Sequence, residues 1–84
     1  MRMYHSTPTK NVASILKEGL WPNKIGIVYL SPTLEMADNR DGQSILEVET
    51  GNLKLTAFDD HTSWEVLCWG HIPPRHVLRV YKAP

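Results

Sequence analysis

Alternating apolar and polar residues mark much of the chain as β-strand. Met1, Met3 and His5 alternate with their neighbours in a short strand that stops at Ser6-Thr7-Pro8. Residues 25–30 form a run of β-branched and aromatic side chains, which is typical of strands. Similar runs predict four later strands, at residues 44–49, 53–58, 64–69 and 77–81.

Residues 8–18 carry the clearest helical pattern. A proline opens the segment, apolar residues then repeat at i, i+3 and i+4, and Gly19 suits a left-handed C-cap. We expect a hydroxyl of Ser6 or Thr7 to cap the first turn. A second polar-residue-plus-proline opening predicts a short helix at residues 34–39.

The order of these elements predicts an α+β fold. The last four strands are joined by links too short for helical crossovers, so we expect a twisted, mainly antiparallel sheet with two short helices. In the strand at 44–49, Leu46 and Val48 are expected on one face, and Glu47 and Glu49 on an exposed face. Eighty-four residues allow one domain, residues 1–84.

The composition narrows the classes of partner. Nine Lys and Arg balance nine Asp and Glu, which argues against binding bulk nucleic acid or anionic lipid. No apolar run is long enough for a secretion signal or a membrane span. The one cysteine, Cys68, cannot form an internal disulfide, so we expect a cytoplasmic protein in which it packs as a small hydrophobic residue. Trp21, Trp64 and Trp69 are many large apolar groups for so small a core, and an exposed subset would suggest a homo-oligomer.

The first candidate for chemistry is the segment Tyr4-His5-Ser6-Thr7. His5 would project beside the exposed amides of the following helix. Free N–H groups and a helix dipole favour an acceptor there, so the corner suits an anionic or carboxamide-bearing ligand. The alternative is that Ser6 and Thr7 are only helix caps and that His5 is a half-buried strand residue.

Two further places bring polar side chains to strand ends. Tyr29 and Ser31 end one strand, and a tyrosine beside a cleft can stack on a flat heterocycle. Glu65 lies among apolar residues, so its carboxylate is paired, solvent-facing or functional. On local pattern alone, Tyr29 also fits a core or sheet-surface position and Glu65 also fits a solvent-facing one.

A metal site is not expected. Asp59, Asp60 and His61 form a polar cluster that His71 and His76 could extend, but their spacing matches no tight ligand motif. A solvated loop explains the cluster better.

Taken together and in order, these segments resemble the ADP-ribosyltransferase fold, in its branch with a His, Tyr and Glu motif. The opening resembles the family's "His-Gly-Thr" segment and the helix that ends in Glu-Gly-Leu. The segment Ile27-Val28-Tyr29-Leu30-Ser31 resembles the second motif. Glu65-Val66-Leu67, followed by Ile72-Pro73-Pro74, resembles the third.

The resemblance implies NAD as co-substrate and His5, Tyr29 and Glu65 as the catalytic set. His5 would bind a ribose hydroxyl, and Tyr29 would stack on nicotinamide. Glu65 would accept from the 2′-hydroxyl of the nicotinamide ribose and stabilise the positive charge that develops as the glycosidic bond breaks. Contacts to NAD would come from His5, Ser6, Thr7, Tyr29 and Ser31.

The chain departs from the family pattern at informative positions. Ser6 stands where glycine is usual, and Ser63 stands where the arginine-modifying toxins have Gln or Glu. RNA 2′-phosphotransferase relatives share the opening motif, but a net charge of zero argues against their basic RNA surface. The acceptor stays open, as do two other classes: a non-catalytic module that binds NAD, ADP-ribose, a related nucleotide or a partner protein, and a purely structural domain.

Overall fold

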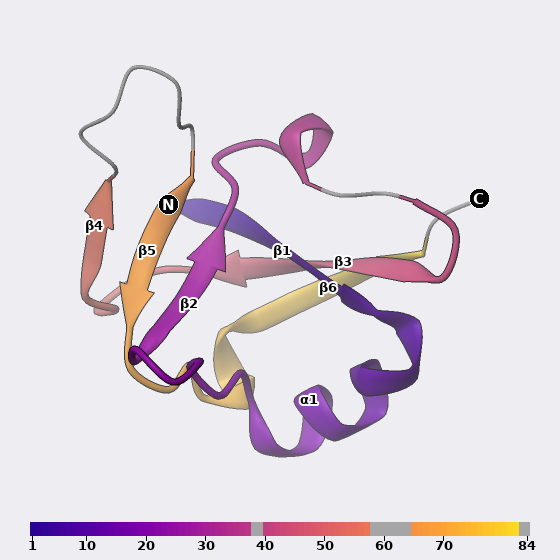
Figure 1. The fold of residues 1–84 in the computed structure, drawn as a ribbon, viewed down its shortest axis with the longest axis horizontal. Coiled ribbons are helices and arrows are strands. Elements are labelled where there is room, and N and C mark those ends of the chain that lie inside the picture. Colours follow the sequence, from indigo (N-terminus) through magenta and orange to yellow (C-terminus); the bar gives the residue numbers. More distant parts are fainter. Residues whose placement is uncertain (38–39, 58–64, 83–84) are drawn as a thin grey trace.

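The computed structural model describes residues 1–37, 40–57 and 65–82. Within these residues, six strands form two antiparallel three-stranded sheets (Figure 1). The first sheet has the order β1-β3-β6, with β1 (Arg2–Pro8), β3 (Gln43–Glu49) and β6 (Val77–Lys82). The second has the order β2-β5-β4, with β2 (Ile27–Leu30), β5 (Val66–Trp69) and β4 (Leu55–Ala57).

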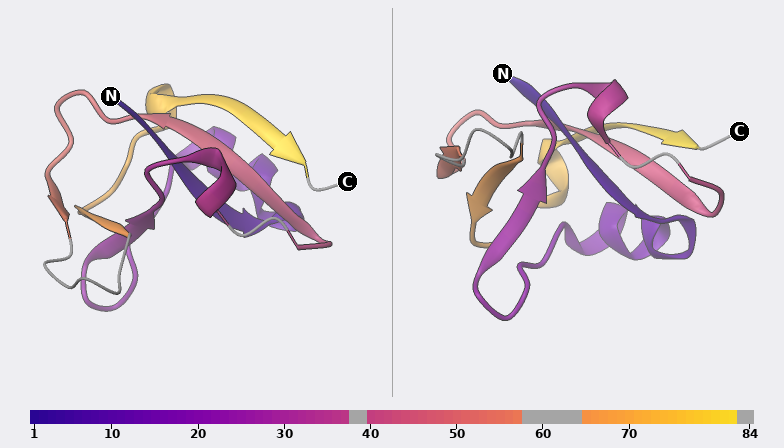
Figure 2. Two further views of the ribbon diagram at one scale, coloured as in Figure 1. Left: turned by 90° about the horizontal axis from the view of Figure 1, so that it is seen from above. Right: turned by 45° about the horizontal axis from the view of Figure 1, so that its top comes forward.

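Within the described residues, one isolated bridge pairs the backbones of the two sheets. The backbone N–H of Tyr4 in β1 donates to the Ser31 carbonyl at 2.9 Å, and the Ser31 N–H donates back to the Tyr4 carbonyl at 2.6 Å. Figure 2 shows β1 between the two groups of strands, with β2, β5 and β4 on one side and β3 and β6 on the other. Two distant parts of the sequence therefore meet beside His5.

The helical segments are short. A 3-10 turn, η1 (Thr9–Asn11), leads into the α-helix α1 (Val12–Glu18), and two further 3-10 turns are η2 (Leu34–Met36) and η3 (Pro74–His76). Helix α1 ends at Gly19, whose φ is +87°. The next residue, Leu20, exchanges backbone hydrogen bonds with Ile72 at 2.8 and 2.9 Å, so the end of the helix is tied to the segment that follows β5. No helix in the described ranges is long and apolar enough to cross a membrane.

The core lies between the two sheets and α1. It is a cluster of buried apolar side chains from both sheets, the helix and the segment after β5: Met3, Ile15, Leu20, Val28, Leu30, Leu46, Val48, Cys68 and Ile72. The prediction that Cys68 packs as a hydrophobic residue is confirmed, because it has no exposed surface. Burial also raises the pKa of its thiol.

The α+β class is confirmed, but several details differ from the prediction. The strands form two sheets rather than one. Strand β1 continues to Pro8, so Ser6 and Thr7 lie in a strand, and no side-chain hydrogen bond caps η1 or α1. The predicted helix at 34–39 is only the 3-10 turn η2, because Ala37 already has an extended backbone. Phe58, Trp64 and the Asp59–Ser63 segment lie outside the described residues.

The expectation of an exposed Glu47 is wrong. Glu47 is only 4% exposed, although it faces away from the apolar core. Since β3 is the central strand of its sheet, side chains from both neighbouring strands close over it. The Tyr81 hydroxyl donates to Glu47 Oε1 at 3.2 Å, and the Tyr4 hydroxyl donates to the same oxygen at 3.5 Å.

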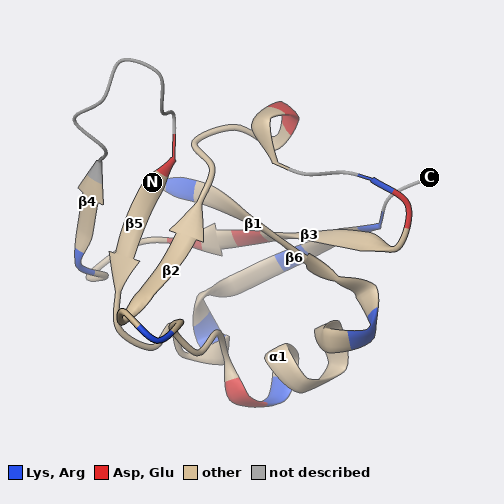
Figure 3. Cartoon of the chain, in the orientation of Figure 1, with Lys and Arg blue, Asp and Glu red and all other residues tan. Residues whose placement is uncertain are grey.

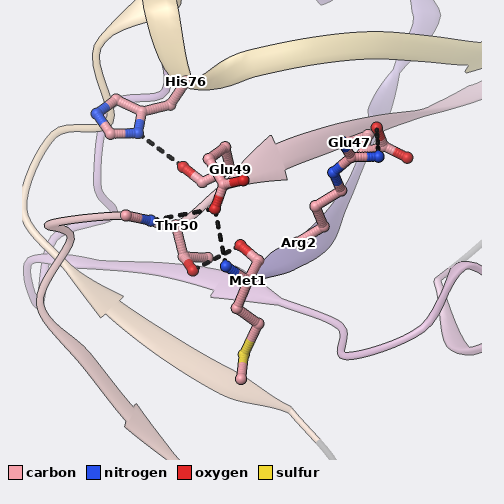
Figure 4. A network of polar contacts seen from close by, with 7 residues as sticks. Met1, Arg2, Glu47, Glu49, Thr50 and His76 are labelled. Atoms are coloured by element: carbon pink, nitrogen blue, oxygen red, sulfur yellow. Dashed lines mark hydrogen bonds and ion pairs between the residues drawn. The ribbon is translucent and has the colours of Figure 1, made fainter.

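The second oxygen of Glu47 has a different environment. Oε2 is buried without a hydrogen-bond partner, and its nearest cation is Arg2 Nη1 at 3.7 Å (Figure 4). Glu49, two residues later at the end of the strand, has a partly exposed side chain that binds the N-terminal ammonium at 2.9 Å. Position along β3 therefore distinguishes two carboxylates for which the sequence pattern predicts the same exposure.

Candidate functional site

His5 and Tyr29 meet at the junction of the two sheets. The imidazole of His5 is half-buried, and its Nδ1 lies 2.8 Å from the backbone carbonyl of Tyr29. A carbonyl only accepts, so Nδ1 carries the proton in this hydrogen bond. Burial lowers the pKa of His5, against a smaller opposing effect of the Tyr29 hydrogen bond. The ring is therefore neutral near pH 7, with a lone pair on Nε2.

The divergence of β1 from β2 explains this contact. Peptide groups alternate in direction along a strand, so those of Tyr29 face β1 as those of Ser31 do. Ser31 bonds to the backbone of Tyr4, but this is an isolated bridge. Two residues before Ser31, the backbone carbonyl of Tyr29 accepts a hydrogen bond from the imidazole of His5. The His5 ring thus lies at the point where the two strands separate.

The side chain of Ser6 is directed away from the gap between β1 and β2. Side chains alternate along β1, so Ser6 lies on the face opposite His5 and Thr7. Its hydroxyl donates to Gln43 Oε1 at 3.2 Å, and the peptide groups of Ser6, like those of Tyr4, are directed toward the β2 side. Thr7 is 5% exposed and contributes little surface to a ligand.

Tyr29 lies on the outer face of the second sheet. Its neighbours Val28 and Leu30 belong to the core, so the ring of Tyr29 faces away from it and is 39% exposed. Ser31, in contrast, is 7% exposed. Its contribution at the junction is mainly its backbone.

Glu65 precedes the first residue of β5. The last pair between β2 and β5 is Leu30–Val66, so one further step in register brings Glu65 to the level of Ser31. The side chain of Glu65 is half-exposed. Among the described residues no hydrogen bond or ion pair joins Glu65 to His5 or Tyr29.

The histidines considered for a metal site make other contacts. His71 Nε2 donates to the Glu18 carbonyl at 2.6 Å, and His76 Nδ1 donates to the Glu49 carbonyl at 2.7 Å. Within the described ranges no three His, Cys, Asp or Glu side chains form a group that could hold a metal ion. Asp59, Asp60 and His61 lie outside those ranges.

Sequence reasoning missed two polar residues near the junction, Gln43 and Glu47. Gln43 holds the Ser6 hydroxyl, and Glu47 binds the hydroxyl of Tyr4, the residue whose backbone forms the bridge. Both contacts depend on the register of β1 against β3, in which Tyr4 lies opposite Glu47. Once this register is known, Glu47 can be identified as a carboxylate that lies between tyrosine hydroxyls on the two neighbouring strands.

Comparison with models of known protein families found no matching family, and a search of curated proteins found no relative. We therefore infer the function from the residues of this chain and their geometry.

Proposed function

We propose that this chain is a small NAD-dependent ADP-ribosyltransferase, with NAD bound where β1 and β2 separate. The observation that carries the proposal is the hydrogen bond from His5 Nδ1 to the Tyr29 carbonyl. It ties together two residues of the proposed catalytic set and leaves Nε2 as an acceptor. No other contact within the described residues occupies that nitrogen.

A neutral imidazole at this point suits a sugar hydroxyl. The hydroxyl of the nicotinamide ribose would donate to Nε2 of His5, and the fixed Nδ1 hydrogen bond would hold the ring in orientation. Since burial lowers the pKa of His5, the acceptor form persists at physiological pH. Protonation would convert Nε2 into a donor and remove this contact.

The nicotinamide group would contact Ser6 and Tyr29. The backbone of Ser6 faces the β2 side of β1, where the carboxamide would approach it. The Ser6 hydroxyl is engaged with Gln43 on the opposite face, so serine in place of the family's glycine leaves the gap open. The exposed ring of Tyr29 offers an aromatic face for stacking.

Glu65 would supply the electrostatic stabilisation. As the bond between ribose and nicotinamide breaks, nicotinamide leaves with the electron pair and positive charge develops on the ribose. A carboxylate beside that charge lowers the barrier, because its attraction is stronger in the transition state than in the ground state. A nucleophile of the acceptor then forms the new bond to the ribose carbon and loses its proton.

The direct test is release of nicotinamide from labelled NAD, alone and with cell lysate. Glu65→Gln should slow release about 100-fold or more, if its loss resembles that of other electrostatic stabilisers. Glu35→Gln is the matched control, because Glu35 is an exposed carboxylate on η2. Equal rates for the Glu65→Gln variant and the unchanged protein would refute the mechanism.

Tyr29 can be tested in the same assay. Tyr29→Phe keeps the ring and should retain most of the activity, whereas Tyr29→Ala should raise KM for NAD because the stacking surface is lost. Similar losses in both variants would indicate that the hydroxyl matters rather than the ring, and stacking would be excluded.

Nucleotide binding without turnover is the second candidate. It is favoured by one observation: no hydrogen bond or ion pair among the described residues holds the Glu65 carboxylate in place. Calorimetry separates the two candidates. Heat on adding ADP-ribose with no NAD consumed supports the binding module, while a melting temperature indifferent to NAD and ADP-ribose contradicts both.

A further inference from the structure

A cluster of aromatic side chains lies on the outer surface near the start of β2 and the end of β5. Trp21 and His71 stack with their ring centroids 4.0 Å apart and an angle of 26° between the rings. Trp21 is 66% exposed and Trp69, two residues before His71, is 40% exposed. We call Trp21, Trp69 and His71 the aromatic surface.

The backbone directs these three side chains away from the core. Leu20 and Ile72 exchange backbone hydrogen bonds, and both side chains belong to the core. Cys68 belongs to the same core. Side chains alternate along β5, so Trp69, which follows the buried Cys68, faces outward from the second sheet. Trp21 follows the buried Leu20 and stacks on His71 at the surface.

The rings are held in place before any ligand arrives. The indole N–H of Trp69 donates to the Thr56 hydroxyl of β4 at 3.1 Å. His71 is fixed by its hydrogen bond to the Glu18 carbonyl at 2.6 Å, and it supports Trp21 from one side. Little side-chain entropy would be lost on binding, which favours recognition by stacking.

Two lysines border the aromatic surface. Lys54 lies immediately before β4, and its backbone carbonyl accepts a hydrogen bond from the backbone N–H of Trp69 at 3.0 Å. Lys24 lies in the turn before β2, where the Gly70 N–H donates to the Gly26 carbonyl. Figure 3 shows basic residues close to the starts of β2 and β4. In the described part of the chain neither lysine forms an ion pair, so both ammonium groups are available to an anion.

We propose that the aromatic surface, with Lys24 and Lys54, binds single-stranded nucleic acid. Exposed aromatic rings beside cations match the two repeating parts of such a strand, the bases and the phosphates. A duplex offers its phosphates but keeps its bases stacked inside, so the rings would find no partner.

The test is fluorescence anisotropy of a labelled oligothymidylate titrated with the full chain. The double variant Trp21→Ala with Trp69→Ala should weaken binding about tenfold or more, since each stacked base contributes on that scale. Trp21→Phe with Trp69→Phe keeps aromatic faces and should restore most of the affinity. Leu78→Ala is the control, because Leu78 is an exposed apolar residue (45%) on β6, outside the aromatic surface.

The salt dependence gives an independent readout. Two phosphate contacts predict a slope of about −1.4 for the logarithm of the binding constant against the logarithm of salt concentration. Lys24→Gln with Lys54→Gln should bring the slope close to zero. Thermal melting of each variant checks that it is folded.

Three results would overturn the proposal: equal binding of duplex and single strand, no loss of affinity in the double alanine variant, and no binding of any oligonucleotide. If no oligonucleotide binds, sedimentation would test whether a second copy of the chain covers this surface. In that case the unchanged protein would sediment as a dimer, and the double alanine variant would sediment as a monomer. Excess NAD should leave the oligothymidylate bound. The outcome is therefore independent of whether the chain consumes NAD.

Discussion

Replacing Glu47 with alanine removes a carboxylate that three side chains surround. Glu47 is 4% exposed and accepts hydrogen bonds from Tyr81 at 3.2 Å and Tyr4 at 3.5 Å, with Arg2 at 3.7 Å. Partial burial and the Glu47 charge raise the pKa of Tyr4, so its phenol stays a donor across the neutral range. The network joins all three strands of the first sheet.

The expected loss of stability follows from these contacts. A hydrogen bond to a charged group contributes about 1.5–3 kcal/mol, and the contact from Tyr4 is long. Removing one partner of a fully buried ion pair costs about 3–5 kcal/mol. Arg2 is 59% exposed and can turn to water, so the loss lies below that range. We expect Glu47→Ala to lower the free energy of unfolding by about 2–3 kcal/mol, or the melting temperature by roughly 10–20 °C.

Thermal and urea unfolding followed by circular dichroism would measure this loss. Glu49→Ala is the matched control on the same strand, where an exposed ion pair contributes little. Glu47→Leu should recover at least half of the loss, because an apolar side chain of similar volume avoids the cost of burying a charge. Equal stability of the Glu47→Ala and Glu49→Ala variants would refute the assignment of Glu47 as a buried centre of the sheet.

Other predictions concern the helix end, the junction and the thiol. Gly19→Ala should cost more stability than Gly42→Ala in urea unfolding: both glycines have positive φ, but a Cβ at Gly19 would clash with the Ile72 carbonyl, while Gly42 has open space. The lowered pKa of His5 means that the unfolded state binds its proton more readily, so stability is fully present above about pH 6.5 and falls as the pH drops through the folded pKa. Melting temperatures from pH 7.5 to 5 should show this fall, and His5→Gln should flatten part of it. Cys68 should react with iodoacetamide only as fast as the chain opens, so its labelling rate should rise with urea; rapid labelling in native buffer would contradict its burial.

The sequence predicted the elements better than their assembly. Periodicity located α1 and most of each strand, because period-2 and helical spacing depend on near neighbours. The second sheet and the burial of Glu47 depend on which strands become neighbours, and this is decided by long-range pairing such as Tyr4 with Glu47. The residues of β3 alone do not indicate that this strand lies at the centre of its sheet.

For the candidate site too, the sequence indicates the residue types but not the contacts between them. The sequence indicates His5 and Tyr29 only as residue types at strand ends, and the structure adds that the ring of His5 bonds to the backbone of Tyr29. The sequence predicts a hydroxyl of Ser6 or Thr7 as the helix cap, but β1 continues to Pro8, and the Ser6 hydroxyl bonds to Gln43. Apolar neighbours distinguish Glu65 in the sequence, but they carry no information about its distance from His5.

The junction at Tyr4 and Ser31 has a consequence for motion. Among the described residues, one isolated backbone bridge and the neighbouring hydrogen bond from His5 to Tyr29 join the edges of the two sheets, so small rotations of one sheet against the other would strain these two contacts. A molecule that contacts both His5 and Tyr29 would restrict this motion of the two sheets. Hydrogen exchange at the amides of Tyr4 and Ser31 would then slow when it binds, and these two amides would report occupancy of the gap even in a variant unable to turn over.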